Sequence, residues 1–135
     1  MPRSRGGVRR SLLLIWAEQK MLTFSLALNL LVLLPVCIGL WMRGPRMTSV
    51  FGDWTPARGI LLSIYMAIGV ASAMLLVRPD VRMASVLLGL QVLYKVTTPF
   101  TVGTVKNPVV ISNLVIAATH LVTLCLVVLP AAAHS

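Results

Sequence analysis

Four long apolar segments, separated by short polar stretches, dominate the pattern of the chain. They cover about residues 21–42, 59–77, 83–105 and 108–129. Each is close to the roughly 20 apolar residues that an α-helix needs to cross a hydrocarbon core about 30 Å thick. The sequence therefore predicts an all-α integral membrane protein, a four-helix bundle that forms one domain over residues 21–130.

Residues 1–20 are basic and include a short amphipathic stretch. Between residues 11 and 20, the side chains of Leu12, Ile15 and Trp16 fall on one helical face. This pattern predicts a short interfacial helix, which could also run on into the first span. The polar run at residues 18–20 interrupts the apolar residues and no small-residue cleavage site follows, so a signal peptide is not expected. Residues 131–135 are a short tail.

Prolines and glycines mark where the helices should bend or end. Pro35 predicts a kink in the first span, because proline removes one helical hydrogen bond. Pro99 predicts a kink or break near the end of the third span. Residues 43–58 are rich in Gly and Pro, and we expect them to be the longest non-helical stretch and the one that a partner or ligand orders.

The polar turn at residues 78–82 is short, which predicts that the second and third spans are antiparallel neighbours. Small residues lie four apart in both spans, Gly69 with Ala73 and Ser85 with Gly89. This spacing is typical of membrane helices that pack closely. We therefore expect these two faces to meet.

Composition agrees with a lipid environment. Of the 135 residues, 58% are hydrophobic and 11% are charged, and the mean hydropathy is +0.92. A soluble domain has about 25% charged residues. The net charge is +9, from 12 Lys and Arg against three acids. Because the bases lie beside apolar spans, anchoring to an anionic bilayer explains them better than nucleic-acid binding does.

The distribution of these bases predicts the orientation. With the amino end inside, the cytoplasmic side holds Arg3, Arg5, Arg9, Arg10, Lys20, Arg78 and Arg82, and the opposite side holds Arg43, Arg46, Arg58 and Lys106. Cytoplasmic loops of membrane proteins carry the excess of Lys and Arg. We therefore expect both termini on the cytoplasmic side of a bacterial inner membrane.

Polar side chains lie deep in the predicted spans, at two depths. Counted from the outer ends of their spans, Asn29 and His120 lie about 20 Å deep and Gln91 about 21 Å deep. A second group, Tyr65, Asn113 and Lys95, lies closer to the outer ends of the spans, roughly 9 to 15 Å deep. Together, the candidate pocket residues are Asn29, Tyr65, Gln91, Lys95, Asn113 and His120.

Two interpretations of these residues stay open. Polar groups are costly in hydrocarbon and should face the interior of the bundle. In the first interpretation they join helices as hydrogen-bonded pairs, Gln91 with His120 and Lys95 with Asn113. In the second they line a small polar pocket that opens to the outer side.

Lys95 is the sharpest single signal, because an ammonium group deep in a span indicates function by default. Two simpler explanations exist. The side chain could reach the outer headgroups, or it could form an ion pair with Asp53 of the outer loop. Of these two we favour the pair with Asp53.

No cofactor is expected. His120 is a single interior histidine and His134 lies in the tail, whereas metal sites draw on several His, Cys or carboxylate ligands. Cys37 and Cys125 lie about 8 and 27 Å from the outer ends of their spans, too far apart for a disulfide. No nucleophile with a base, phosphate loop or carboxylate pair is present, so we expect no enzymatic activity.

A small chain with few charged residues and no catalytic groups predicts an accessory, assembly or scaffold subunit of a larger membrane complex. The alternatives are a small transporter or channel that acts as a homo-oligomer, and a binder of a lipid- or quinone-like molecule. The expected partners are the bilayer and other membrane subunits. One long loop followed by short links resembles the layout of DoxX-like four-helix membrane proteins; the resemblance is in spacing alone and implies no functional residue.

Overall fold

The computed structural model describes residues 5–132 and is all-helical over that range. Its helices are α1 (Arg5–Met42), α2 (Pro45–Phe51), α3 (Pro56–Val77), α4 (Val81–Val102) and α5 (Pro108–Ala132). Residues 1–4 of the predicted basic N-terminus and residues 133–135 of the predicted tail, with His134, lie outside the described residues.

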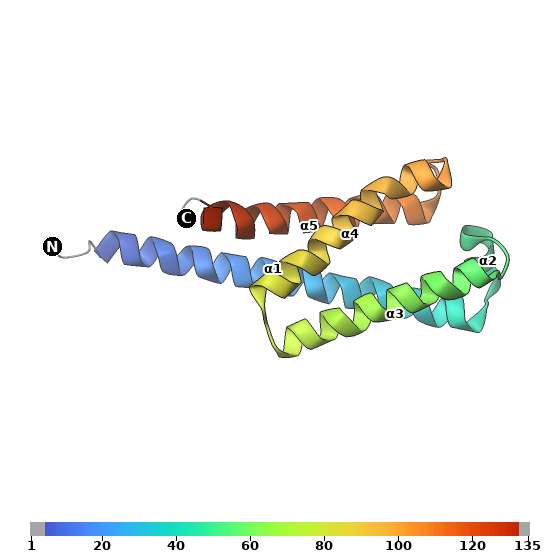
Figure 1. Cartoon of the computed structure of the whole chain (residues 1–135), viewed down its shortest axis with the longest axis horizontal. Coiled ribbons are helices and arrows are strands. Elements are labelled where there is room, and N and C mark those ends of the chain that lie inside the picture. Colours follow the sequence, from blue (N-terminus) through green and yellow to red (C-terminus); the bar gives the residue numbers. More distant parts are fainter. Residues whose placement is uncertain (1–4, 133–135) are drawn as a thin grey trace.

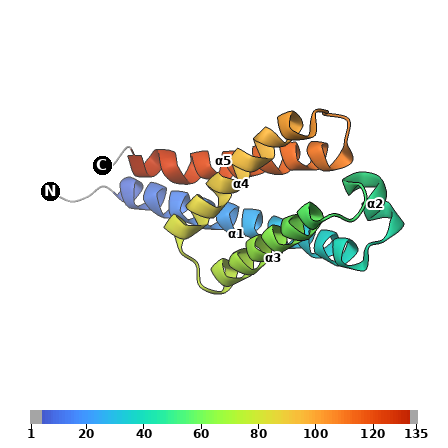
Figure 2. The same ribbon diagram turned by 45° about the vertical axis from the view of Figure 1, so that its right-hand side comes forward.

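The long helices pack as two antiparallel pairs, α1 with α3 and α4 with α5 (Figure 1). α3 and α4 are joined by the short turn at residues 78–80 and diverge from it (Figures 1 and 2). We call the end of the molecule toward which they diverge the α2 end, because α2 lies there. The opposite end, where α1 begins and α5 finishes, is the termini end.

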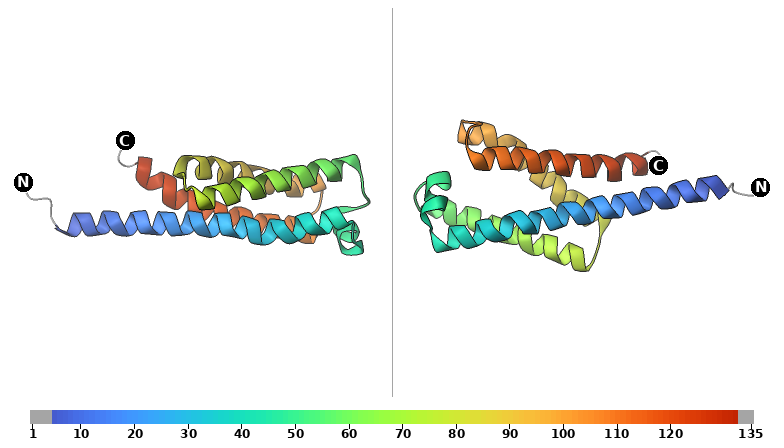
Figure 3. Two further views of the ribbon diagram at one scale, coloured as in Figure 1. Left: turned by 90° about the horizontal axis from the view of Figure 1, so that it is seen from below. Right: turned by 180° about the vertical axis from the view of Figure 1, so that it is seen from behind.

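α1 is one continuous helix of 38 residues. The segment expected to be an interfacial helix, residues 11–20, is its first part, and no break separates it from the span. The reason is local, because no Gly or Pro occurs between residues 8 and 34 to end a helix. α1 also stays helical through Pro35. Its first turns extend beyond the other helices (Figure 3). In the segment expected to be interfacial, the side chain of Trp16 is 62% exposed.

The stretch expected to be non-helical, residues 43–58, contains α2, so that prediction is corrected. Pro45 is the first residue of α2, where a missing N–H is tolerated. The left-handed Gly52, with φ +80°, follows the end of α2 and donates its N–H to Thr48 O. Met47 packs over Gly39 of α1 so closely that a Cβ there would lie 3.0 Å from Met47 Cγ. This contact seats α2 on α1.

α4 passes through Pro99 and ends three residues later at Val102. The expected break therefore falls at Gly103, whose left-handed backbone (φ +75°) ends the helix while its N–H donates to Pro99 O. α5 then begins at Pro108, as predicted. Asn107 connects this turn to α2, because its Nδ2 donates to Val50 O at 3.1 Å.

The small-residue faces of α3 and α4 do not meet, in contrast to the prediction. A Cβ built at Gly69 or at Gly89 would have no neighbour within 4 Å in the described part of the chain. The physical reason is the divergence of α3 and α4 from their turn. Gly69 and Ala73 instead border an apolar groove between α1 and α3, with a volume of about 270 Å³.

Three helices are long and apolar enough to cross a membrane: α1 over Leu12–Met42, α3, and α5 over Pro108–Val128. α4, which carries Gln91 and Lys95, is not in this group. Large apolar side chains cover the outside of the molecule; Leu31 is 73% exposed and Phe100 is 83% exposed. Such a surface fits lipid and not water.

Two apolar clusters form the core. The Leu22 cluster, toward the termini end, contains Leu22, Leu26, Ala84, Leu88 and Val127. The Leu40 cluster, toward the α2 end, contains Leu33, Leu40, Leu62 and Tyr65. The polar side chains described next lie in the same interior.

Candidate functional site

One buried network joins α1, α3 and α5 around Asn29. The Asn29 Nδ2 donates to Ser72 Oγ at 3.1 Å, and its Oδ1 lies 3.0 Å from His120 Nε2. Because Oδ1 can only accept, Nε2 carries the hydrogen in this pair and Nδ1 of a neutral His120 is an acceptor. All three side chains are at most 2% exposed. We call this set, with Ser25 and Thr123, the Asn29 network.

Ser25 and Thr123 extend the network by about one turn toward the termini end. Their hydroxyl oxygens lie 2.8 Å apart, and both residues are fully buried. Thr123 also donates to Thr119 O at 3.1 Å, so Ser25 is the donor between the two hydroxyls. Ser25 precedes Asn29 by four residues and Thr123 follows His120 by three, which places each pair on one helical face.

A second network lies closer to the α2 end, around Lys95. The Lys95 Nζ donates to Asn113 Oδ1 at 3.0 Å, and Asn113 Nδ2 donates to Thr98 Oγ1 at 3.4 Å. Lys95 is only 3% exposed, and its Nζ lies 4.8 Å from the centre of the Tyr94 ring. The structure thus brings Lys95 and Asn113 together. We call these three residues the Lys95 network.

The structure does not bring Asp53 and Lys95 together. Asp53 is exposed in the segment between α2 and α3, whereas Lys95 is buried and bonded to Asn113. The reason is that α4 stays helical beyond Lys95 and directs this side chain inward. The favoured ion pair is therefore replaced by an amide contact.

Gln91 also differs from its predicted pairing. The sequence pairs Gln91 with His120, but the Nε2 of His120 is bonded to Asn29. Gln91 is 1% exposed, and neither its Nε2 nor its Oε1 has a hydrogen-bond partner among residues 5–132. The His120 Nδ1 and the Tyr94 hydroxyl likewise have no partner there. Two nitrogens of Arg58, Nε and Nη2, are also buried without a partner in the described chain.

Two adjoining cavities lie at the α2 end, next to the Lys95 network. The first has a volume of about 160 Å³ and is bordered by Lys95, Tyr65 and Asn113. The second has a volume of about 470 Å³ and lies among α2, α3, α4 and α5, bordered by Tyr94 and also by Tyr65 and Asn113. We call the two together the α2-end cavity. The candidate residues Tyr65, Lys95 and Asn113 thus share one cavity, whereas Asn29, Gln91 and His120 do not border it.

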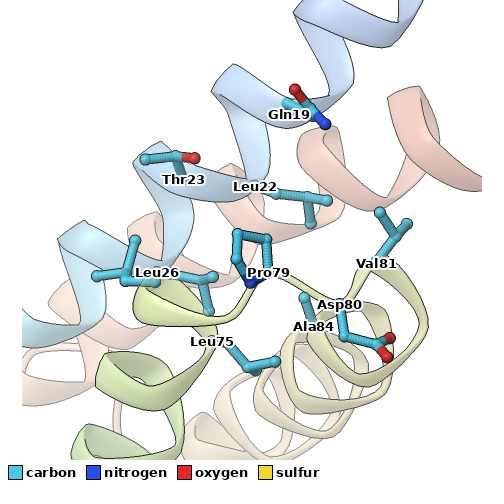
Figure 4. Close-up of a pocket in the computed structure, with 10 residues that line it drawn as sticks. Gln19, Leu22, Thr23, Leu26, Leu75, Pro79, Asp80, Val81 and Ala84 are labelled. Carbon is cyan, nitrogen blue, oxygen red and sulfur yellow. The ribbon is translucent and has the colours of Figure 1, made fainter.

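A separate pocket of about 200 Å³ lies at the termini end, between α1 and the turn at residues 78–80 (Figure 4). Gln19 and Thr23 of α1 border it, together with Asp80. The Asp80 Oδ1 accepts from Met83 N at 2.9 Å, so this carboxylate caps α4. The apolar wall of this pocket is formed by Leu22 and Leu26, which belong to the Leu22 cluster.

Sequence reasoning missed several buried polar residues. Ser25, Ser72 and Thr123 are fully buried members of the Asn29 network. Their only signal is helical spacing from a stronger polar residue, as for Ser25 and Asn29. Arg58, which is 5% exposed, was expected at the outer surface. It donates to Gly52 O and lies 5.6 Å from the Trp54 ring, so it holds the segment before α3 in place.

Within the described residues, no group of three or more His, Cys, Asp or Glu is placed to hold a metal ion. Comparison with known proteins finds no matching family, no similar curated protein and no similar solved structure.

Proposed function

We propose that the chain is a four-span membrane protein that binds an amphiphilic small molecule, lipid- or quinone-like, in the α2-end cavity. A hydrogen-bond-accepting or anionic head of this molecule would contact Lys95. The observation that carries the proposal is Lys95 itself, a buried ammonium that borders a cavity and has one amide oxygen as its hydrogen-bond acceptor in the described chain.

The electrostatics of Lys95 support a ligand with acceptor groups. An ammonium has three hydrogens to donate, and Asn113 accepts one of them. A buried charge without an opposite charge is costly. A carboxylate, phosphate or quinone carbonyl in the cavity would accept a second hydrogen and reduce that cost.

The shape and lining of the cavity support an amphiphile. Its larger part is bordered by apolar side chains such as Phe51 and Val110, with Tyr65, Tyr94 and Thr98 among them. The divergence of α3 and α4 places this part between two helices that face lipid on their outer sides (Figure 2). An apolar tail could therefore reach the bilayer while the head stays at Lys95.

The outer face of α4 supports its role as a fourth span. Gln91 and Lys95 point inward, at 1% and 3% exposure, whereas Leu90, Leu93 and Phe100 are 61%, 64% and 83% exposed. Polar side chains inside and apolar ones outside are the arrangement expected of a membrane helix with functional groups. The excess of bases near the termini end favours a cytoplasmic location for that end, in a bacterial inner membrane.

Native mass spectrometry tests the proposed function. The protein is extracted gently from its own membrane, and collisional activation is raised until loosely attached lipids leave. We expect one small molecule per chain to remain, and its exact mass and fragments identify its class. A protein that carries no molecule once the surface lipids are removed would contradict the proposal.

A second candidate is the accessory-subunit role, which the apolar groove between α1 and α3 favours. Gly69 opens into this groove without a neighbour in the described chain, and glycine at such a position lets the helix of another subunit approach closely. The variant Gly69→Leu should abolish co-purification of a stoichiometric partner, whereas the control Gly89→Leu, at an equally open position of α4, should not. Purification of the wild-type chain without any partner would contradict this role.

A further inference from the structure

The packing of α4 against α5 fixes where Gln91 and His120 lie relative to each other. These helices are antiparallel, and Thr98 of α4 contacts Asn113 of α5. Moving seven residues along each helix, two turns toward the termini end, leads to Gln91 and His120. Positions seven apart lie on nearly the same helical face, so Gln91 faces His120 as Thr98 faces Asn113.

The polar atoms at this place need partners that the described protein does not supply. The Gln91 amide presents two N–H donors and a carbonyl acceptor, and the His120 Nδ1 presents an acceptor. All are buried without a hydrogen bond within residues 5–132. A buried polar group without a hydrogen-bond partner destabilises the folded protein, and native proteins satisfy such groups with internal water.

We propose that internal water lies between Gln91 and His120 and joins the Lys95 and Asn29 networks into one hydrated column. A water molecule there can donate to both Gln91 Oε1 and His120 Nδ1, which are acceptors. Lys95 lies one helical turn from Gln91 toward the α2 end and borders the α2-end cavity. The column therefore opens at the α2 end. This inference goes beyond ligand binding, because it assigns a route for water and protons as far as His120.

The Leu22 cluster closes the column toward the termini end. The last polar pair of the column is Ser25 with Thr123. Leu22 and Val127 lie about one helical turn farther toward the termini end. Leu22 also borders the termini-end pocket in Figure 4. A single apolar layer therefore separates the column from that pocket, and the chain holds a path that is open at one end only.

Hydroxyl-radical footprinting of the wild-type protein in lipid nanodiscs tests the inference, because radicals form from water that lies beside a side chain. We expect labelling of His120 to fall at least five-fold in Gln91→Leu, which fills the place of the amide with an apolar side chain of similar size, whereas a small cysteine at the same position leaves room for water. Leu62, buried in the Leu40 cluster, serves as the dry reference and should be labelled equally slowly in both proteins, which also shows that the variant is folded. Labelling of His120 that does not change in a folded Gln91→Leu would overturn the proposal.

Silver-ion accessibility tests from which end the column fills. The two native cysteines are first removed by Cys37→Ala and Cys125→Ala. The single variants Gln91→Cys, Leu93→Cys and Lys106→Cys are then made in this background. Each is exposed to Ag⁺ in vesicles that present either the α2 end or the termini end to the outside, and the intact mass of the protein reports the reaction. Lys106 is exposed at the α2 end and marks that side, and Leu93 faces outward two residues from Gln91. We expect Gln91→Cys to react from the same side as Lys106→Cys and at least ten-fold faster than Leu93→Cys. A rate equal to that of Leu93→Cys, or reaction only from the opposite side, would refute the open column, whatever the ligand experiment shows.

Discussion

His120 and Asn29 are 91 residues apart in the sequence, and their side chains meet at 3.0 Å in the interior of the molecule. This contact joins the two helix pairs, because Asn29 belongs to α1 and His120 to α5. Asn29 continues the link to Ser72 of α3. A single amide therefore holds three helices at one depth.

Replacing Asn29 should destabilise the protein more than replacing an outward-facing residue of the same helix. Asn29→Leu removes two hydrogen bonds and leaves His120 Nε2 and Ser72 Oγ unpaired, which should cost about 1–3 kcal/mol in the free energy of unfolding. Unfolding in a mixed-detergent titration measures it. The control Leu31→Ala, at a side chain that is 73% exposed, should change the free energy by less than about 0.5 kcal/mol. Equal effects of the two substitutions would show that the Asn29 network is not structural.

The Ser25–Thr123 contact should be weakly coupled. A double-mutant cycle with Ser25→Ala and Thr123→Val isolates the interaction between the two hydroxyls, which lie 2.8 Å apart. Interhelical hydrogen bonds in membrane proteins contribute about 0.6 kcal/mol on average, and we expect a coupling of this size. A coupling energy of zero would mean that each hydroxyl bonds only within its own helix, as Thr123 does with Thr119.

Gly103 should resist substitution, whereas Gly69 should accept it. Gly103 has φ +75°, a left-handed conformation that costs a residue with a Cβ roughly 1–2 kcal/mol. Gly69 is helical with open space around it, so Gly69→Ala should stabilise the monomer by about 0.5–1 kcal/mol. Thermal unfolding of Gly103→Val and Gly69→Ala should therefore move in opposite directions. A melting temperature of Gly103→Val equal to that of the wild type would contradict the assigned helix end.

Filling the α2-end cavity should expel its ligand without touching Lys95. Val109 borders both parts of the cavity, and Val109→Phe adds a ring that takes the space of the ligand. The mass of the retained small molecule should disappear from the native mass spectrum of this variant. Val115→Phe, on the same helix at a position that is 63% exposed, should keep it. Retention by both variants would place the molecule elsewhere.

The depth of polar residues could be predicted from the sequence, but their neighbours only in part, because Lys95 pairs with Asn113 as predicted whereas Gln91 does not pair with His120. Helical rise fixes how deep Asn29 and His120 lie, and the structure has them in contact. Rise says nothing about which face of a helix meets which neighbour. For this reason the sequence paired Gln91 with His120, although Asn29 of α1 occupies the Nε2 of that imidazole.

The segment after α1 shows a second limit. Its glycines and prolines predicted a loop, yet Pro45 begins α2 and Met47 packs on Gly39 of α1. A short helix of this kind depends on a tertiary contact, which local composition does not reveal. The favoured pair of Asp53 with Lys95 also failed on tertiary structure, because α4 stays helical beyond Lys95 and buries this side chain against Asn113, whereas Asp53 is exposed.

The amount of small molecule retained by Lys95→Met tests the central claim most directly. Methionine keeps much of the length of the lysine side chain and removes its ammonium, and Lys106→Met removes a charge from an exposed position at the same end. Each purified protein is extracted with organic solvent, and the molecule is quantified per chain by liquid chromatography and mass spectrometry. We predict that Lys106→Met retains the wild-type amount and that Lys95→Met retains at most a tenth of it. Equal amounts in folded Lys95→Met and wild-type protein would contradict the assignment of Lys95 as the group that holds the head of the ligand.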